Sequence, residues 1–234
     1  MDASTVAALV TAGHREEMLV LAHATDRVSA ELAVRAGVDG LAHVVVNELP
    51  ESDLVATAVE RNLFVIPTLV VLEAICGRFS PASMLDDERV ASYLSPLSRM
   101  MIENASWPAT TNFRRDFSVS QTLVKRLHDA GVTILAGTDA GSPGGVHGVS
   151  IHRELRLLVE AGLSPSEALT AATAAPAARF GLRDRGRIAS GMVADLLLVQ
   201  GDPTMDITAT NGVAGIWRHG VRLDREAPRI EAAP

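Results

Sequence analysis

Short continuous apolar runs alternate with amphipathic segments along much of the chain. The apolar runs occupy residues 18–22, 40–46, 63–66 and 133–136. The amphipathic segments, which have a helical period, occupy residues 2–17, 26–37, 51–62 and 118–131. Apolar runs of this length between turn residues are typical of strands that are buried on both faces. Strands that alternate with helices of this length predict an α/β fold with a parallel sheet.

Helix ends are marked by recurring sequence words. VRAGVDGLAH, HDAGVTILAG and VEAGLS each place a glycine after an apolar helix end, and in the first two words a strand follows. This repetition predicts a repeated βα unit in which glycine ends each helix. Asp26 is placed to cap the helix that follows it, and Ser164 with Glu167 predicts a capping box.

The alternation breaks between residues 72 and 118, where serine, proline, methionine and aspartate become frequent. Five of the eight aromatic side chains fall here: Phe79, Tyr93, Trp107, Phe113 and Phe117. One interpretation is an insertion of short helices that folds over the mouth of the strands and forms apolar walls for a ligand. The other is a packed helical segment that makes no contact with substrate.

The end of the chain has a different pattern. Residues 194–199, 215–218 and 221–223 read as β-strands, and His219 and Gly220 are placed to join the last two as a hairpin. We therefore expect a small β appendage after the βα units, followed by a disordered tail.

Composition excludes several classes of function. The chain has 234 residues, 47% hydrophobic residues and a formal net charge of −7, with no basic patch, so nucleic acids and anionic membranes are poor candidate partners. No signal peptide or membrane-spanning run is recognisable, and Cys76 is the only cysteine, which together favour a cytoplasmic location. The only lysine, Lys125, is expected on the solvent face of a helix, which argues against Schiff-base chemistry.

Three polar residues stand where predicted strands end: His23, His43 and Asp139. In a parallel barrel the carboxyl ends of the strands converge on one face, so these side chains are expected to meet. Two imidazoles and a carboxylate suit a divalent transition metal with open positions for water and substrate. The alternatives are that each histidine is simply a satisfied polar residue, and that Asp139 caps a helix or turn.

Asp139 is the candidate catalytic residue, because a carboxylate beside metal-bound water can take its proton and pass it to a leaving group. His147 follows the glycine-rich loop and is a candidate for binding a substrate oxygen. The alternative is a surface loop histidine that has no role.

Several stretches resemble the C-terminal portion of the amidohydrolase superfamily. They are LVLAHAT, AVRAGVDGLAHV, VIPTL, VTILAGTDAG with GVHG, ELRLLVEAGLSPSEALTAATAAPAARFGL and GRIASGMVADLLLVQGDP. The wording is most similar to the imidazolonepropionase-like and Xaa-Pro dipeptidase-like branch. The resemblance implies that His23 and His43 are the metal ligands of the fifth and sixth barrel strands, and that Asp139 is the ligand and general base of the eighth. It also implies hydrolysis of an amide, dipeptide or cyclic amide, usually with zinc.

The chain departs from the family at its beginning, since the four earlier strands and their His-x-His pair are missing. The expected fold is therefore half of a TIM-type βα barrel of parallel strands with a helical insertion and a small C-terminal β appendage. The expected organisation is a partial barrel at 1–190, with the insertion at 72–118, a small β-sandwich at 191–225 and a disordered tail at 226–234.

An open half-barrel exposes two sheet edges and an apolar interior. The chain is therefore expected to form a homo-oligomer or to be a fragment of a longer chain. The rival function is a noncatalytic half-barrel that persists as an oligomer-forming scaffold. A lysine-dependent aldolase on the same barrel is disfavoured by the position of Lys125.

Overall fold

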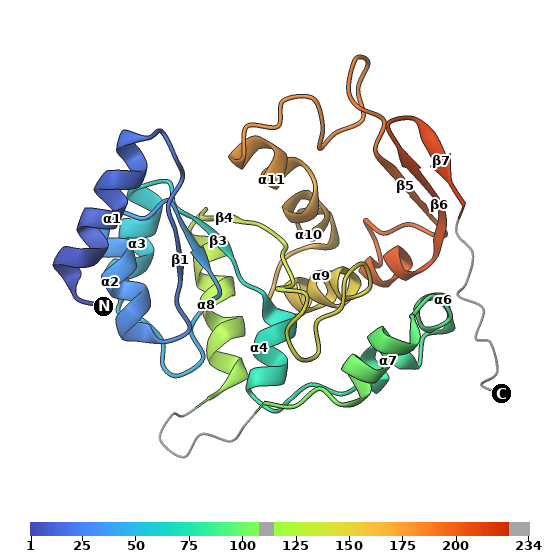
Figure 1. Cartoon of the computed structure of the whole chain (residues 1–234), viewed down its shortest axis with the longest axis horizontal. Helices are drawn as coiled ribbons and strands as arrows, with labels where there is room; N and C mark the ends of the chain where they lie inside the picture. Colours follow the sequence, from blue (N-terminus) through green and yellow to red (C-terminus); the bar gives the residue numbers. More distant parts are fainter. Residues whose placement is uncertain (108–114, 225–234) are drawn as a thin grey trace.

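The computed structural model describes residues 1–107 and 115–224. Four strands form a parallel sheet, and their order across the sheet is the same as their order along the chain (Figure 1). These strands are β1 (Leu21–His23), β2 (Gly40–Ala42), β3 (Phe64–Ile66) and β4 (Thr133–Ile134). Neighbouring strands all pair in parallel, so their carboxyl ends lie at the same edge of the sheet. The predicted α/β fold with a parallel sheet is confirmed.

The helices around this sheet follow the predicted pattern. They are α1 (Ala3–Arg15), α2 (Arg27–Ala36), α3 (Ser52–Glu60) and α8 (Phe117–Asp129). Asp26 caps α2 by accepting a hydrogen bond from the Ser29 backbone N–H at 2.9 Å. Gly37, Gly131 and Gly162 lie just after helices and are all left-handed, with φ of 92°, 86° and 115°. The three recurring glycines therefore do end helices, as the sequence predicts.

The strands are shorter than the apolar runs that predict them. The run from 40 to 46 pairs with its neighbours only as far as Ala42, because His43 has a φ of 76° and turns the chain out of the sheet. Val44, Val45 and Val46 are at most 1% exposed, so they belong to the core without belonging to a strand.

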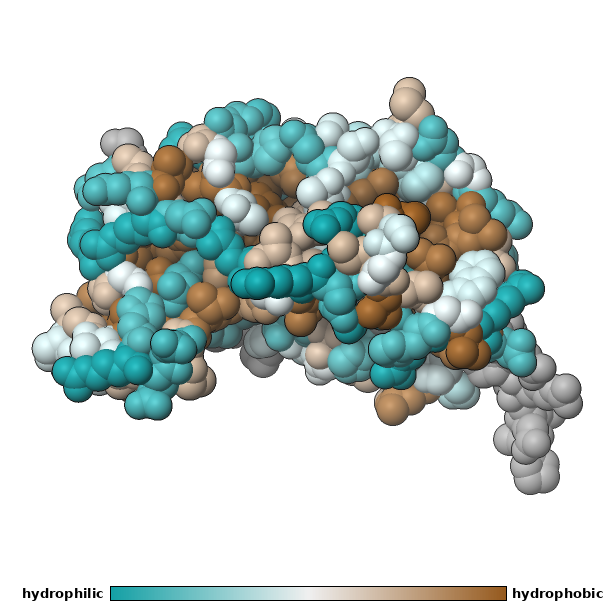
Figure 2. Space-filling view, turned by 90° about the horizontal axis from the view of Figure 1, so that it is seen from above, coloured by the Kyte–Doolittle hydropathy of each residue, from teal (hydrophilic) through white to brown (hydrophobic). Residues whose placement is uncertain are grey.

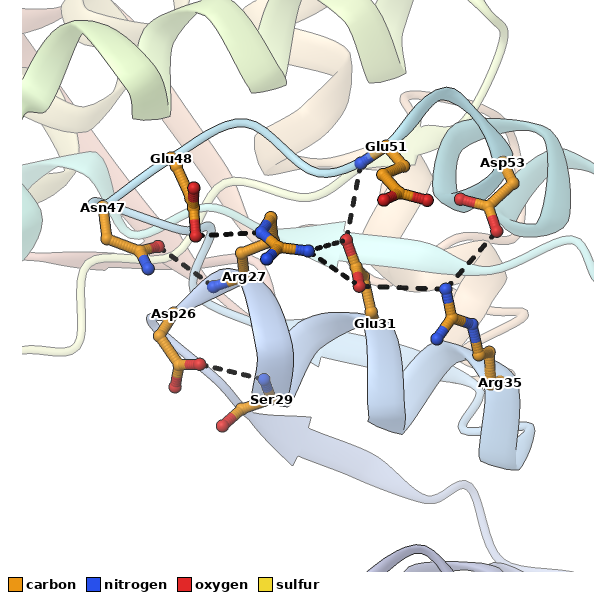
Figure 3. Close-up of polar contacts among 9 residues, drawn as sticks. All are labelled: Asp26, Arg27, Ser29, Glu31, Arg35, Asn47, Glu48, Glu51 and Asp53. Atoms are coloured by element: carbon orange, nitrogen blue, oxygen red, sulfur yellow. Dashed lines mark hydrogen bonds and ion pairs between the residues drawn. The ribbon is translucent and has the colours of Figure 1, made fainter.

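A polar network fixes the segment that follows β2 against α2 (Figure 3). The Asn47 side-chain oxygen accepts a hydrogen bond from the Arg27 backbone N–H at 3.0 Å. The Arg27 guanidinium binds Glu31 at 3.1 Å and Glu48 at 3.0 Å. The largely buried Glu31 also accepts from the Glu51 backbone N–H at 3.4 Å. The loop beyond the carboxyl end of β2 is therefore held at several points.

The stretch expected to be an insertion, residues 72–118, contains short helices in its described part. The helices here are α4 (Leu69–Ile75), α5 (Ala82–Leu85), α6 (Glu88–Ala91) and α7 (Pro96–Glu103). Helix α4 is core structure, since five of its side chains are at most 4% exposed and it packs against α8 and α9. Trp107 lines the cavity described below, whereas Phe113 lies outside the described residues. The stretch thus contributes to both the core and the cavity wall.

The C-terminal part consists of helices followed by a separate antiparallel sheet (Figure 1). Its elements are α9 (Ser150–Glu160), α10 (Pro165–Ala172), α11 (Ala174–Arg179), β5 (Leu196–Val199), the 3₁₀ helix η1 (Ile207–Asn211), β6 (Val213–Arg218) and β7 (Val221–Leu223). The capping box at the start of α10 is confirmed. Left-handed His219 and Gly220 form the predicted hairpin turn between β6 and β7.

The described part of the appendage is one three-stranded sheet, whereas a β-sandwich has two packed sheets. Both faces of β5 are open to solvent, since Leu197 and Leu198 are 53% and 54% exposed. A second layer is therefore not formed by residues 191–224. The expected tail, 226–234, lies outside the described residues.

Apolar side chains also reach the surface in and just before the first strand of the parallel sheet, where Leu21 and Leu19 are 38% and 44% exposed. Figure 2 shows brown apolar surface at several places between polar residues on the face seen from above. Within residues 1–107 and 115–224, no helix is long and apolar enough to cross a bilayer.

Candidate active site

The two strand-end histidines meet at the carboxyl edge of the parallel sheet. His23 is the last residue of β1 and pairs in register with Ala42, the residue before His43. His23 Nδ1 and His43 Nε2 are 2.9 Å apart, and the rings meet edge to face with centroids separated by 4.4 Å. The two imidazoles converge as the sequence predicts, with His23 exposed and His43 buried.

The other ring nitrogen of His43 contacts Thr68. His43 Nδ1 lies 2.5 Å from Thr68 Oγ1, and the same hydroxyl donates to the Pro67 carbonyl at 2.7 Å. Thr68 is left-handed, with a φ of 54°, which is unfavourable for a β-branched residue. Backbone strain that is held in place by surrounding structure is concentrated at functional sites. Burial and the neighbouring His23 lower the pKa of His43, whereas the charge of Asp139 acts in the opposite direction.

Asp139 lies in the loop after β4 and is also left-handed, with a φ of 51°. Its carboxylate accepts a hydrogen bond from the Ser142 hydroxyl at 3.0 Å and is exposed. It does not cap the next helix, α9, whose N-cap residue is Val149. The carboxylate therefore does not cap a helix, and its hydrogen bond to Ser142, three residues later, lies within the loop that follows β4.

His23, His43 and Asp139 line a common cavity of about 410 Å³. The other described residues that line it are Thr25, Val46, Val71, Ile75, Trp107 and Arg115. Aliphatic and aromatic walls with a few polar groups and one cation are typical of a small-molecule site. A guanidinium in such a wall suits a substrate that carries a carboxylate.

The donor types fit a divalent metal, but the described residues do not form a complete set of metal ligands. Two imidazole nitrogens that face one another at 2.9 Å, with a carboxylate on the same cavity wall, are a suitable donor set. Across residues 1–107 and 115–224, no three His, Cys, Asp or Glu side chains come close enough together to hold an ion. The assignment of these residues as ligands therefore stays a prediction.

His147, the candidate for binding a substrate oxygen, is exposed beyond the glycine-rich loop. It is not one of the described residues that line the 410 Å³ cavity. Its role in substrate binding also stays a prediction.

A buried carboxyl group that was not predicted from the sequence holds the loop next to the site in place. Glu154 of α9 is fully buried, and its two oxygens accept hydrogen bonds from the backbone N–H groups of Leu69 and Val70 at 3.0 and 2.9 Å. Burial raises the pKa of Glu154 to about 8, although the two N–H donors act against that change. These donors begin α4, directly after Thr68, so Glu154 fixes the loop that contacts His43.

Sequence signals for both supporting residues were present. Glu154 lies three and four residues before Leu157 and Leu158, on the apolar face of a helix where a carboxylate is unexpected. Thr68 follows Pro67 just after the end of a predicted strand. His23 was chosen as a candidate because it also lies at the end of a predicted strand.

Comparison with known proteins shows the family. The sequence profile of the amidohydrolase family matches residues 2–223. An imidazolonepropionase of Deinococcus deserti is 40% identical over 103 residues, which are 42% of this chain and 26% of that protein. One from Streptomyces coelicolor is 38% identical over 102 residues, again 42% of this chain and 26% of that protein.

Solved structures share the fold. A Xaa-Pro dipeptidase with bound methionine in the active site superposes with a TM-score of 0.69 at 22% identity, covering 96% of this chain and 49% of that one. A putative prolidase from Bifidobacterium longum gives a TM-score of 0.69 at 26% identity, covering 98% and 52%. The chain therefore spans about half the length of these structures. The match over residues 2–223 shows that this chain belongs to the amidohydrolase family.

Proposed function

We propose that this chain supplies the metal-binding C-terminal half of a TIM-type amidohydrolase barrel that hydrolyses a carbon–nitrogen bond in a small molecule. The observation that carries the proposal is the pair of ring nitrogens, His23 Nδ1 and His43 Nε2, facing each other at the carboxyl edge of a parallel sheet. Catalytic residues of βα barrels lie at this edge. Family membership and the half-length match to solved relatives support the same assignment.

In this proposal His23, His43 and Asp139 would hold a divalent ion, with zinc the first candidate for a set of imidazoles and a carboxylate. When bound, such an ion would supply Lewis-acid chemistry, activating a water molecule and polarising a substrate carbonyl. Asp139 accepts the proton of the attacking water and returns it to the departing nitrogen. Its exposed carboxylate, which accepts a hydrogen bond from the Ser142 hydroxyl, is accessible for that transfer.

The cavity points to the class of substrate. It is large enough for a dipeptide or a cyclic amide, and Arg115, whose guanidinium also donates to the Ile75 carbonyl at 3.1 Å, lines it as a candidate contact for a substrate carboxylate. Trp107 and Val71 offer an apolar surface to the remainder of the substrate. We propose a small amide, dipeptide or cyclic amide with an acidic group, and His147 as a further contact when substrate is bound.

The domain organisation is part of the proposal. Residues 1–190 form the partial barrel, 72–118 the insertion that borders the cavity, and 191–225 the appendage. We also retain the cytoplasmic location as a prediction.

Metal analysis of the purified chain tests the proposal. The expected result is about one equivalent of a divalent ion, which is lost when His23 and His43 are both replaced by alanine. His219→Asn is the matched control, because His219 lies in an exposed hairpin turn whose left-handed conformation asparagine tolerates. A folded chain that binds no ion after incubation with zinc would contradict the proposal.

One set of observations favours the rival, a noncatalytic half-barrel that associates with a second copy. Leu21 at the edge of the parallel sheet and Leu197 in the appendage are both large exposed apolar residues. Exposed apolar edges of this kind promote association. A metal-free, folded oligomer in size-exclusion chromatography with light scattering would support the scaffold and count against the enzyme.

A further inference from the structure

The Thr68 hydroxyl stands between two buried groups and has only one proton to give. Its oxygen is 2.7 Å from the Pro67 carbonyl oxygen and 2.5 Å from His43 Nδ1. A carbonyl oxygen can only accept a hydrogen bond, so the hydroxyl proton is committed to Pro67. Thr68 Oγ1 can then serve His43 only as an acceptor, and His43 Nδ1 has to be the donor.

The opposite arrangement is electrostatically unfavourable. If the hydroxyl turned its proton toward His43 Nδ1, two acceptor oxygens, Thr68 Oγ1 and the Pro67 carbonyl, would face each other at 2.7 Å with no proton between them. Thr68 is 4% exposed and His43 is 5% exposed, so there is little access for water to compensate.

The loop that carries the hydroxyl is not free to move away. Leu69 and Val70, the next two residues, are tied through their N–H groups to the buried carboxyl group of Glu154. Residue 68 itself holds a left-handed conformation between β3 and α4. The hydroxyl therefore has a fixed position relative to the imidazole.

We propose that Thr68 is a positioning residue that fixes His43 as its Nδ1–H tautomer, so that the Nε2 lone pair is the one presented to the cavity and to His23. The neutral ring has one N–H, and placing it on Nδ1 leaves Nε2 as the acceptor or ligand atom. Hydrogen bonds from the second ring nitrogen set the tautomer of metal-binding histidines in this way. The tautomer itself follows from the hydrogen bonds of Thr68. Its purpose, which is to present Nε2 to a metal ion, rests on the proposed function.

The two histidines are thereby unequal. With His43 Nε2 as an acceptor, the 2.9 Å contact requires His23 Nδ1 to donate in the metal-free chain. His23 is exposed and, among residues 1–107 and 115–224, has no contact with a fixed loop comparable with that between His43 and Thr68, so its ring can change tautomer when a cation requires Nδ1 as a ligand. His43 needs no such change.

Ring ¹⁵N NMR of the metal-free chain at pH 8, with ¹⁵N-labelled histidine, tests this directly. The signals of His43 are identified by their loss in His43→Asn. The expected result is an Nδ1–H tautomer for His43 in the wild type and in Thr68→Ser, which keeps the hydroxyl. Thr68→Val keeps the shape without the hydroxyl and is expected to give a mixture or the other tautomer.

Zinc affinity, measured by competition with a chelating dye, is the second readout. Loss of the supporting hydrogen bond is expected to weaken binding about 10- to 100-fold in Thr68→Val, with Thr68→Ser close to wild type. An Nε2–H tautomer in the wild type overturns the inference, and so does Thr68→Val with unchanged tautomer and affinity. Should Thr68→Val fail to fold, the wild-type and Thr68→Ser spectra still decide.

The two readouts separate this inference from the function it serves. The expected tautomer together with no zinc binding in any variant would support the role of Thr68 and contradict the metal-dependent hydrolase. Zinc binding by a wild type that holds the Nε2–H tautomer would do the reverse.

Discussion

Glu154 is the buried carboxyl group that holds the start of α4, and its replacement by glutamine gives a quantitative test of how the site is supported. The side chain is fully buried, and its two oxygens accept from the N–H groups of Leu69 and Val70. Helix α4 has no side-chain hydrogen bond from its own N-cap residue, Thr68. Glu154 thus replaces the usual cap from a distant position in the sequence.

The size of the effect follows from these contacts. Glutamine keeps one oxygen acceptor but turns an NH₂ group toward the second backbone N–H. A buried donor left without an acceptor costs about 1–3 kcal/mol, so Glu154→Gln is expected to lower the free energy of unfolding by about that amount near pH 5. Glu154→Ala leaves two donors and a cavity, and is expected to cost more.

The effect should depend on pH because burial raises the pKa of Glu154 from 4.5 to about 8. A group whose pKa is higher in the folded state stabilises the fold fully below its unfolded pKa and loses that contribution as pH rises through the folded pKa. One pKa unit corresponds to 1.36 kcal/mol, so this shift represents roughly 5 kcal/mol lost between pH 4.5 and 8. Glutamine does not titrate and escapes this loss.

The assay is urea unfolding followed by far-UV circular dichroism at several pH values from 5 to 9. The wild type is expected to be the more stable at pH 5, and Glu154→Gln is expected to equal or exceed it at pH 9. Glu60→Gln is the matched control, since Glu60 is exposed at the end of α3 and should change stability by less than about 0.5 kcal/mol. A difference between wild type and Glu154→Gln that stays constant or grows with pH would refute the reasoning, because it would mean that the carboxylate is charged throughout.

Three further predictions concern the candidate base and the surface. Asp139→Asn should lower any hydrolytic rate about 10²- to 10⁴-fold while leaving the urea midpoint unchanged, because the side chain is exposed; retained activity would remove Asp139 from the mechanism. Asp26→Ala removes the 2.9 Å cap to the Ser29 N–H and should cost about 1 kcal/mol in urea unfolding, whereas an unchanged midpoint would mean that water replaces the cap. Lys125→Gln should change stability by less than about 0.5 kcal/mol, because the Lys125–Asp129 pair is exposed, and a larger loss would show an unexpected packing role.

Local sequence features predicted the elements whose ends are set by local chemistry. Asp26, Gly37 and the Ser164–Glu167 box each satisfy helix-end groups with neighbouring residues, and all are found in the structure. The predicted strands were too long. A hydrophobic run shows that its residues are buried, but it does not show that they hydrogen-bond to a neighbouring strand. The left-handed turn at His43 ends the pairing inside an apolar run, and the side chain at this turn contacts Thr68, which is 25 residues away.

The site shows the same division between local and distant causes. Strand-end position was sufficient to bring His23 and His43 together, because parallel register carries that information. The capping of α4 by Glu154 could not be predicted, since it joins residues 84 and 85 positions apart and depends on how α9 packs against α4. The position of Arg115 in the cavity wall could not be predicted either, because it depends on the path of a loop, which local propensities do not determine.

The burial of the three candidate ligands follows the order of the strands. His43 follows β2, an inner strand with neighbours on both sides, and is buried and held by Thr68. His23 and Asp139 belong to β1 and to the loop after β4, the outer strands of this sheet, and both are exposed. The residues around a metal site control how much solvent reaches its ligands. If the barrel is closed by further strands beside β1 and β4, as we propose, those strands would cover the two exposed ligands and leave the inner one unchanged. In that case the inner part of the proposed site would already be formed in this chain, and the outer part would depend on closure.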